Sequence, residues 1–318
     1  MAQGGCESLQ QDSLSSGEFI AMNVAVSLSP RDLWLLVLLT VLWGVNWPVM
    51  KLGVSDFPAL SFRTLCMAGG VPLLWLIARV QGHSVRIARE HWRECLVLAL
   101  TNMTIWYVLS IYAVQMLSSG RAAILGYTMP VWTALIGWWF WRDRPQGRMG
   151  LGLLAAAAAI AMLLIDEWRM LAGNPLGMAL MLAAAMVWGW GTQLMRRRRL
   201  QVPVVVISFW MMVISVAVCS VLSVALESDR WVRWPNTVEW WAVLYNIVMV
   251  FGISQLLWFR LATLLPPVAS SLSVMMIPVV GVFSGMFMLG EMPGAADLLA
   301  LGCVLLAMAS VLLPARSR

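Results

Sequence analysis

The chain has 318 residues, of which 61% are hydrophobic and 11% are charged, with a mean hydropathy of +0.82. Soluble domains are about 45–50% apolar and about 25% charged, so a soluble fold of this size is excluded. The net charge of +6 comes from 20 Arg and a single Lys, Lys51, against 15 acids. Because the arginines form short clusters between apolar runs, they indicate membrane topology and not a surface for nucleic acid.

Loops that carry charge, Pro or Gly divide the chain into ten apolar runs, each near the length of about 20 residues that a membrane-spanning helix needs. The expected spans are Leu33–Leu52, Phe57–Ile77, Cys95–Val114, Ala122–Trp141, Met149–Ile165, Pro175–Leu194, Val204–Leu226, Trp240–Phe259, Val268–Leu289 and Ala295–Leu313. Two pairs of neighbouring runs are separated by short turns alone, so nine or eleven spans stay open as alternatives. The sequence predicts an all-α polytopic membrane protein with ten transmembrane helices.

Basic residues favour one side of this topology. Fifteen of the 21 lie in the loops that share a side with both termini: Arg31, Arg79, Arg86, Arg89, Arg93, Arg142, Arg144, Arg148, Arg196, Arg197, Arg198, Arg199, Arg260, Arg316 and Arg318. Five lie on the other side: Lys51, Arg121, Arg169, Arg230 and Arg233. Because cytoplasmic loops collect Lys and Arg, we expect the polar tail at residues 1–32 and both termini in the cytoplasm, and the spans in the inner membrane.

The two halves of the chain resemble each other. A shift of 148 residues aligns Ile124–Asp143 with Leu272–Glu291 and places Pro130 on Pro278. A shift of 145 residues aligns VLWG in the first span with MVWG in the sixth. A repeat of five spans puts its second copy upside down in the membrane, which is the architecture of many secondary transporters, with the substrate site near the midplane.

Four segments resemble the EamA family of the drug/metabolite transporter superfamily: LWGVNWPVMK, FRTL, GYTMPVWTALIGWWFWRD and IPVVGVFSGMFMLGE. The resemblance covers two units, 33–166 and 175–314. It implies ten helices in two inverted five-helix repeats, cytoplasmic termini, and export of small metabolites or drugs, with amino acids as the commonest cargo. We expect no cofactor and no metal.

The sequence departs from related transporters at two places. The first repeat has Asp143 where the family usually has Glu, whereas the second keeps Glu291. We expect both acids to tie a helix end to a basic loop or to a helix N-terminus. The first span also lacks the acid found in the small multidrug-resistance branch, which argues against simple proton/drug antiport through an intramembrane carboxylate.

Arg63 is the only ionisable side chain well inside a predicted span. Such a residue is expensive in lipid and should face protein or water. One hypothesis is that it binds a substrate carboxylate or a gating partner. The alternative is that it snorkels to the surface or pairs with a backbone carbonyl.

Neutral polar and aromatic side chains near mid-span are the other candidates for a substrate cavity. With Arg63 they form the predicted substrate-binding set: Asn46, Trp47, Asn102, Trp106, Tyr107, Tyr127, Trp188, Gln193, Gln255, Trp258 and Ser271. The 148-residue shift maps Tyr107 onto Gln255, so these two could line one cavity from opposite sides. The same groups could instead be interhelical contacts worth about 0.6 kcal/mol each.

Three prolines are the expected hinges or helix breaks: Pro48, Pro130 and Pro278. Runs of small residues such as Ala155–Ala159 permit close packing of helices within the chain. Alternatively, they could form the contact between two subunits of a homodimer.

The sequence thus favours an inner-membrane secondary transporter that exports small metabolites such as amino acids by alternating access. A multidrug exporter is the main alternative. A membrane-embedded enzyme would need acids or histidines at depth, and the two histidines, His83 and His91, lie in a predicted loop. A channel would need charged rings or a filter sequence, and a scaffold without transport activity is the remaining alternative.

Overall fold

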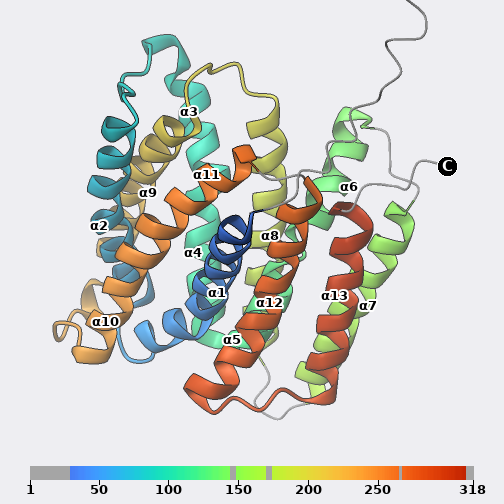
Figure 1. Cartoon of the computed structure of the whole chain (residues 1–318). Coiled ribbons are helices and arrows are strands. Elements are labelled where there is room, and N and C mark those ends of the chain that lie inside the picture. Colours follow the sequence, from blue (N-terminus) through green and yellow to red (C-terminus); the bar gives the residue numbers. More distant parts are fainter. Residues whose placement is uncertain (1–28, 144–147, 170–173, 265–266, 313–318) are drawn as a thin grey trace, which may run out of the picture.

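The structure, a computed structural model, describes residues 29–143, 148–169, 174–264 and 267–312, with side chains at all of these except 169 and 262–273. Within these ranges the regular elements are all helical. The first half of the chain forms α1 (Pro30–Gly53), α2 (Ala59–Val80), α3 (Trp92–Ala99), α4 (Ile105–Met116), α5 (Ser119–Gly126), α6 (Met129–Trp141) and α7 (Met149–Arg169). The second half forms α8 (Pro175–Arg196), α9 (Val204–Glu227), α10 (Thr237–Tyr245), α11 (Gln255–Leu264), α12 (Pro267–Leu289) and α13 (Ala295–Leu312), which stand beside the first as one bundle (Figure 1).

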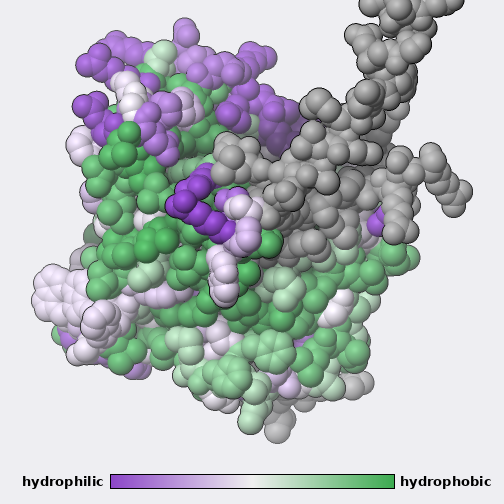
Figure 2. Space-filling model, viewed as in Figure 1, coloured by the Kyte–Doolittle hydropathy of each residue, from purple (hydrophilic) through white to green (hydrophobic). Residues whose placement is uncertain are grey.

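Eight helical stretches in the described ranges are long and apolar enough to cross a membrane. They are Pro30–Gly53, Ala59–Val80, Arg89–Met116, Met149–Trp168, Pro175–Arg196, Val204–Arg230, Thr237–Leu261 and Ala295–Leu312. Val274–Leu289 is a shorter apolar helix, and the predicted fourth span is divided into α5 and α6. An all-helical membrane protein is therefore confirmed, and the count of ten spans stays a prediction. Figure 2 shows the apolar band that these helices present below a hydrophilic cap.

The helices of the two halves begin at matched positions. α1 and α8, α2 and α9, and α3 and α10 each begin 145 residues apart, and α5 and α12 begin 148 residues apart. These are the two shifts that the sequence comparison gives. The fold is therefore built from two repeats.

The end of the fourth segment has the same geometry in both repeats. Arg142, with φ 54°, follows α6, and Gly290, with φ 68°, follows α12. In each case the next N–H bonds the carbonyl six residues back, at 3.1 Å to Gly137 and 3.4 Å to Gly285. This left-handed helix ending suits Gly at position 290 and is strained for Arg at position 142.

Contacts between helix ends show that the repeats run in opposite directions. Lys51, at the end of α1, donates from Nζ to the carbonyls of Gln115 and Leu117 at the end of α4, at 2.8 Å each. Glu167, at the end of α7, accepts from the N–H of Asn174 just before α8, at 2.7 Å. Both contacts lie at one end of the bundle, which we call the acidic end after its buried and half-buried carboxylates, among them Asp166, Glu167, Glu227, Glu291 and Asp297.

The opposite end, here the arginine-rich end, carries Arg86, Arg89, Arg93, Arg142 and Arg197. There Asp143, just after α6, pairs with Arg197, just after α8, at 2.6 Å. The arginine-rich end is the upper end of the bundle in Figures 1 and 2. Since α1 leads toward the acidic end and α8 leads away from it, the second repeat is inverted relative to the first.

A carboxylate from the second repeat caps a helix of the first. Glu227, at the end of α9 and 1% exposed, accepts from the N–H groups of Leu60 and Ser61 at 2.9 Å each. It also accepts from Ser61 Oγ at 3.0 Å and from the Tyr112 hydroxyl at 3.2 Å. The N-cap residue of α2, Pro58, has no side chain that could do this, so Glu227 satisfies the start of α2 and fixes α2 on α9.

We expect Glu227→Gln to lower the midpoint of thermal unfolding. The amide would turn an NH2 group toward buried backbone donors, and such unsatisfied donors cost about 1–3 kcal/mol. Tryptophan fluorescence of the detergent-solubilised protein on heating measures the midpoint. Glu90→Gln, at a side chain that is 78% exposed, is the control. If the two variants unfold together, Glu227 is not a structural cap.

Candidate functional site

The interior of the bundle lies between two matched helix pairs. α1 packs on α12 in the same way that α8 packs on α6. Gly44 of α1 leaves room for Val280, and Gly189 of α8 leaves room for Trp132 at the corresponding place. A Cβ atom at either glycine would collide with the facing helix. These close contacts fix the relative positions of helices that carry candidate residues.

Arg63 is a buried charged residue of this interior. It lies four residues into α2, about 6 Å along the helix axis from its start, and is 1% exposed. Its guanidinium donates to Met50 Sδ on α1 and, at 3.5 Å, to Asn246 Oδ1. Its Cζ lies 4.8 Å from the ring centroid of Tyr107 on α4. Four segments therefore meet around Arg63.

No carboxylate pairs with Arg63 in the part of the chain that the structure describes. Its Nε is buried and has no hydrogen-bond partner there. Glu227, at the end of α9, caps the start of the helix that carries Arg63, but its two oxygens already accept from four donors, which is the full capacity of a carboxylate. The Arg63 side chain does not snorkel, because it is 1% exposed, and its hydrogen-bond acceptors are side-chain atoms and not backbone carbonyls.

Other buried polar atoms near these helices also lack partners within the described ranges: Asn46 Oδ1 on α1, Thr64 Oγ1 on α2 and Ser254 Oγ in the segment between α10 and α11. α1 and α2 both pack against that segment. Since buried polar atoms are nearly always paired, such unpaired atoms mark places where water or a ligand completes the bonding.

All six aromatic candidates lie in ring pairs. Centroid separations are 5.2 Å for Trp106 and Trp188, 6.3 Å for Trp47 and Tyr127, 6.0 Å for Tyr107 and Phe251, and 5.6 Å for Trp43 and Trp258. The first two pairs join residues that the sequence selects independently from distant helices.

Four polar candidates are not among the described hydrogen-bond and ring partners of Arg63, and the side chain of one of them lies outside the described residues. Asn102 donates to the carbonyl of Leu98 on its own helix at 3.1 Å. Gln193 lies toward the arginine-rich end, where it donates to the carbonyl of Thr133 at 2.6 Å. Gln255 is half-buried at the start of α11. The side chain of Ser271 lies outside the described residues.

The three prolines have different surroundings. Pro130 lies in the first turn of α6, directly after the break from α5, whereas Pro48 lies inside α1 and Pro278 inside α12. The matched positions 130 and 278 are thus a helix start in one repeat and a helix interior in the other. Their role as hinges stays a prediction.

Sequence reasoning missed a matched pair of irregular helical segments. Leu100–Thr104 (η2), between α3 and α4, and Asn246–Ser254 (η4), between α10 and α11, are both π-helical. Each holds an Asn, Asn102 or Asn246, that bonds the carbonyl four residues back. Such π segments are frequent at functional sites. The recurrence of Asn near the 145-residue shift is the signal that could have found Asn246.

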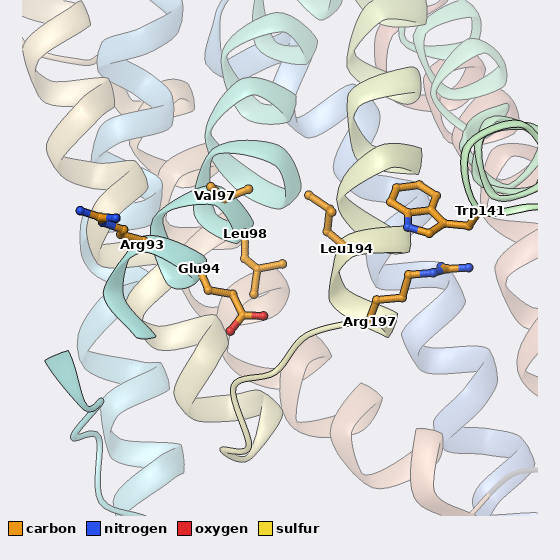
Figure 3. Close-up of a pocket in the computed structure, with 7 residues that line it drawn as sticks. All are labelled: Arg93, Glu94, Val97, Leu98, Trp141, Leu194 and Arg197. Atoms are coloured by element: carbon orange, nitrogen blue, oxygen red, sulfur yellow. The ribbon is translucent and has the colours of Figure 1, made fainter. Parts of the chain in front are cut away.

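The inverted symmetry is broken at the two ends of the bundle. α10 packs closely on α1 at the acidic end, whereas its mate α3 barely touches α8 at the arginine-rich end. A cavity of about 350 Å³ opens there, lined by Arg93, Glu94, Val97, Leu98, Trp141, Leu194 and Arg197. Figure 3 shows Leu98 on α3 and Leu194 on α8 facing each other across it.

The acidic end is held together by charges from both repeats. Arg121 on α5, 6% exposed, pairs with Asp166 and Glu167 on α7 and, through Nε at 2.7 Å, with Asp297 on α13. Glu291, after α12, accepts from the N–H of Ser119 at the start of α5, at 2.9 Å. The sequence expectation for the acids is confirmed, because Asp143 binds a basic loop residue and Glu291 a helix N-terminus.

Comparisons with known proteins agree with this architecture. The chain matches the EamA-like transporter family over residues 31–165 and 175–313. It is 23% identical to the uncharacterized transporter YoaV of Bacillus subtilis, over 80% of this chain and 88% of that protein. It is 24% identical to the uncharacterized inner membrane transporter YedA of Escherichia coli, over 86% of this chain and 88% of that protein. A crystal structure that is 18% identical matches 88% of this chain and 98% of its own with a TM-score of 0.62, which shows a shared fold.

We expect a cysteine at position 97 to react with a water-soluble maleimide and one at position 242 to be protected. Val97 lines the cavity and is 47% exposed, whereas its mate Ala242 on α10 is 4% exposed against α1. Labelling of Val97→Cys and Ala242→Cys, in a variant without the native cysteines and in nanodiscs that leave both ends accessible, measures the difference. Equal labelling would contradict an opening at one end.

Proposed function

The chain belongs to the EamA-like transporter family, and from this premise we propose that it exports small metabolites across the inner membrane by alternating access. The proposal rests on the difference in packing between the two ends of the bundle: α10 packs closely on α1, whereas α3 hardly contacts α8. In an inverted repeat the α3–α8 and α10–α1 contacts are equivalent, so exchange of their packing would close one end and open the other. The present arrangement is then the state open at the arginine-rich end.

The charge distribution supports an orientation for this state. Loops rich in Arg are retained in the cytoplasm, so the arginine-rich end would face the cytoplasm and the cavity of about 350 Å³ would receive solute from inside the cell. The name of YedA, an inner membrane transporter, supports the same membrane. A solute that enters there and leaves at the acidic end is exported.

Two substrate classes follow from the interior. Arg63, without a carboxylate partner in the described chain, favours metabolites with a carboxylate, and amino acids are the first class to test. Export of drugs is the second class, favoured by the ring pairs of Trp106 with Trp188 and Trp47 with Tyr127. The residues that we propose to bind solute are Arg63, Tyr107, Asn46, Trp106 and Trp188.

Transport and not catalysis is the activity we propose. The relatives are named as transporters. In the described ranges no group of three or more His, Cys, Asp or Glu side chains lies close enough to hold a metal ion. The buried carboxylates of the described chain lie near helix ends, where they cap helices or pair with arginines; they are Glu167, Glu227, Glu239 and Asp297.

Counterflow measures the proposed activity. Proteoliposomes preloaded with a mixed pool of amino acids should accumulate labelled single amino acids in a saturable, protein-dependent manner. If tight vesicles exchange no amino acid, the substrate class moves to other metabolites or drugs, tested in the same vesicles. Absence of exchange with all of these pools would contradict a transporter.

A further inference from the structure

We propose that the preferred substrates are monoanionic carboxylates without an ammonium group, bound through Arg63. This inference rests on the proposed transport function and keeps its carboxylate-bearing metabolites, but it places hydroxy acids ahead of amino acids as the preferred substrates. It follows from the contacts of Arg63, which include no carboxylate in the described chain, and from the fact that the nearby carboxylate, Glu227, already accepts four hydrogen bonds.

The first step is the state of the guanidinium. An arginine carries five N–H donors, and here Arg63 meets two neutral acceptors, a thioether sulfur and an amide oxygen at 3.5 Å. Nε meets none in the described chain. An isolated buried charge costs several kcal/mol unless it is paired. A carboxylate can pair with Nε and a terminal nitrogen at once, in the bidentate geometry that suits Arg.

The second step is the balance of charge. One carboxylate would give the Arg63 guanidinium the directly bonded anion that it lacks in the described chain. The ammonium of a zwitterion would add a charge there, and the neighbours of Arg63 are Met50, Tyr107 and Asn246, all neutral. Both carboxylate oxygens of Glu227 already accept hydrogen bonds at the start of α2. One face of the Tyr107 ring, where a cation could bind, is already occupied by Arg63.

The third step concerns the rest of the solute. Tyr107 also contacts Phe251 edge-on at 6.0 Å, and Asn46 and Ser254 offer unpaired neutral polar atoms on α1 and η4. Aromatic rings and neutral polar groups suit an apolar or aromatic tail with a hydroxyl group. A hydroxy acid such as phenyllactate therefore fits the chemistry better than phenylalanine, from which it differs by a hydroxyl in place of the ammonium group.

Matched pairs of ligands test the inference. Quenching of tryptophan fluorescence at pH 7.5 measures binding of phenyllactate against phenylalanine, and of 2-hydroxyisocaproate against leucine. We expect each hydroxy acid to bind at least tenfold more tightly than its amino acid. Arg63→Gln should weaken hydroxy-acid binding at least tenfold, whereas Arg79→Gln, an exposed arginine near the end of the same helix, should not change it. Equal or tighter binding of the amino acids would overturn the inference.

A stability measurement separates binding from a structural role. Because Arg63 is an unpaired buried charge, Arg63→Met should leave the unfolding midpoint of the ligand-free protein unchanged or higher. Hydroxy acids should raise the midpoint of the unsubstituted protein and not that of Arg63→Met. A lower midpoint in ligand-free Arg63→Met would assign Arg63 to the structure and overturn the inference.

Counterflow with the same ligands separates this inference from the transport function on which it rests. Exchange of amino acids but not hydroxy acids would overturn the substrate class and leave the transporter intact. Exchange of neither, nor of any drug or metabolite, would overturn both.

Discussion

Helix ends inside a membrane protein must find partners without bulk water, and this constraint orders the whole bundle. Two starts in the first repeat are completed by carboxylates of the second: Glu227 caps α2, and Glu291 caps α5 through the N–H of Ser119. Lys51 donates hydrogen bonds to the carbonyls at the end of α4. Each bond crosses between segments far apart in sequence, so the backbone requirement also fixes how the helices pack.

The same constraint explains why the two repeats differ. Asp143 and Glu291 follow identical left-handed helix endings, yet Glu291 reaches a helix start whereas Asp143 pairs with Arg197. Arg197 also stacks on Trp141, with its Cζ 4.7 Å from the ring centroid. Equivalent acids thus hold α5 at the acidic end and a loop residue at the arginine-rich end. The ends of the bundle differ although their sequences are related.

Much of this architecture could be predicted because it depends on composition and period. Apolar length gives the spans, the 145- and 148-residue shifts give the repeat, and scarcity of charge singles out Arg63. The π segments could not be predicted, since they arise from packing and carry no Pro or Gly at their starts, Leu100 and Asn246. The hinge prediction treats Pro130 and Pro278 alike, but a proline in a first turn and one inside a helix make different demands on the backbone.

The charge partners at the acidic end were equally hidden in sequence, and they bear on how that end could open. Arg121 has acids from its own repeat, Asp166 and Glu167, as well as Asp297 from the other. If α5 and α13 part, Arg121 keeps two partners, and water entering the gap can solvate Asp297. Opening would therefore leave neither Arg121 nor Asp297 buried without a partner. Arg63 differs, because its described neighbours supply no anion in the closed packing. A solute carboxylate would supply the anionic partner that Arg63 lacks in the described chain, which is why we propose that Arg63 binds the solute.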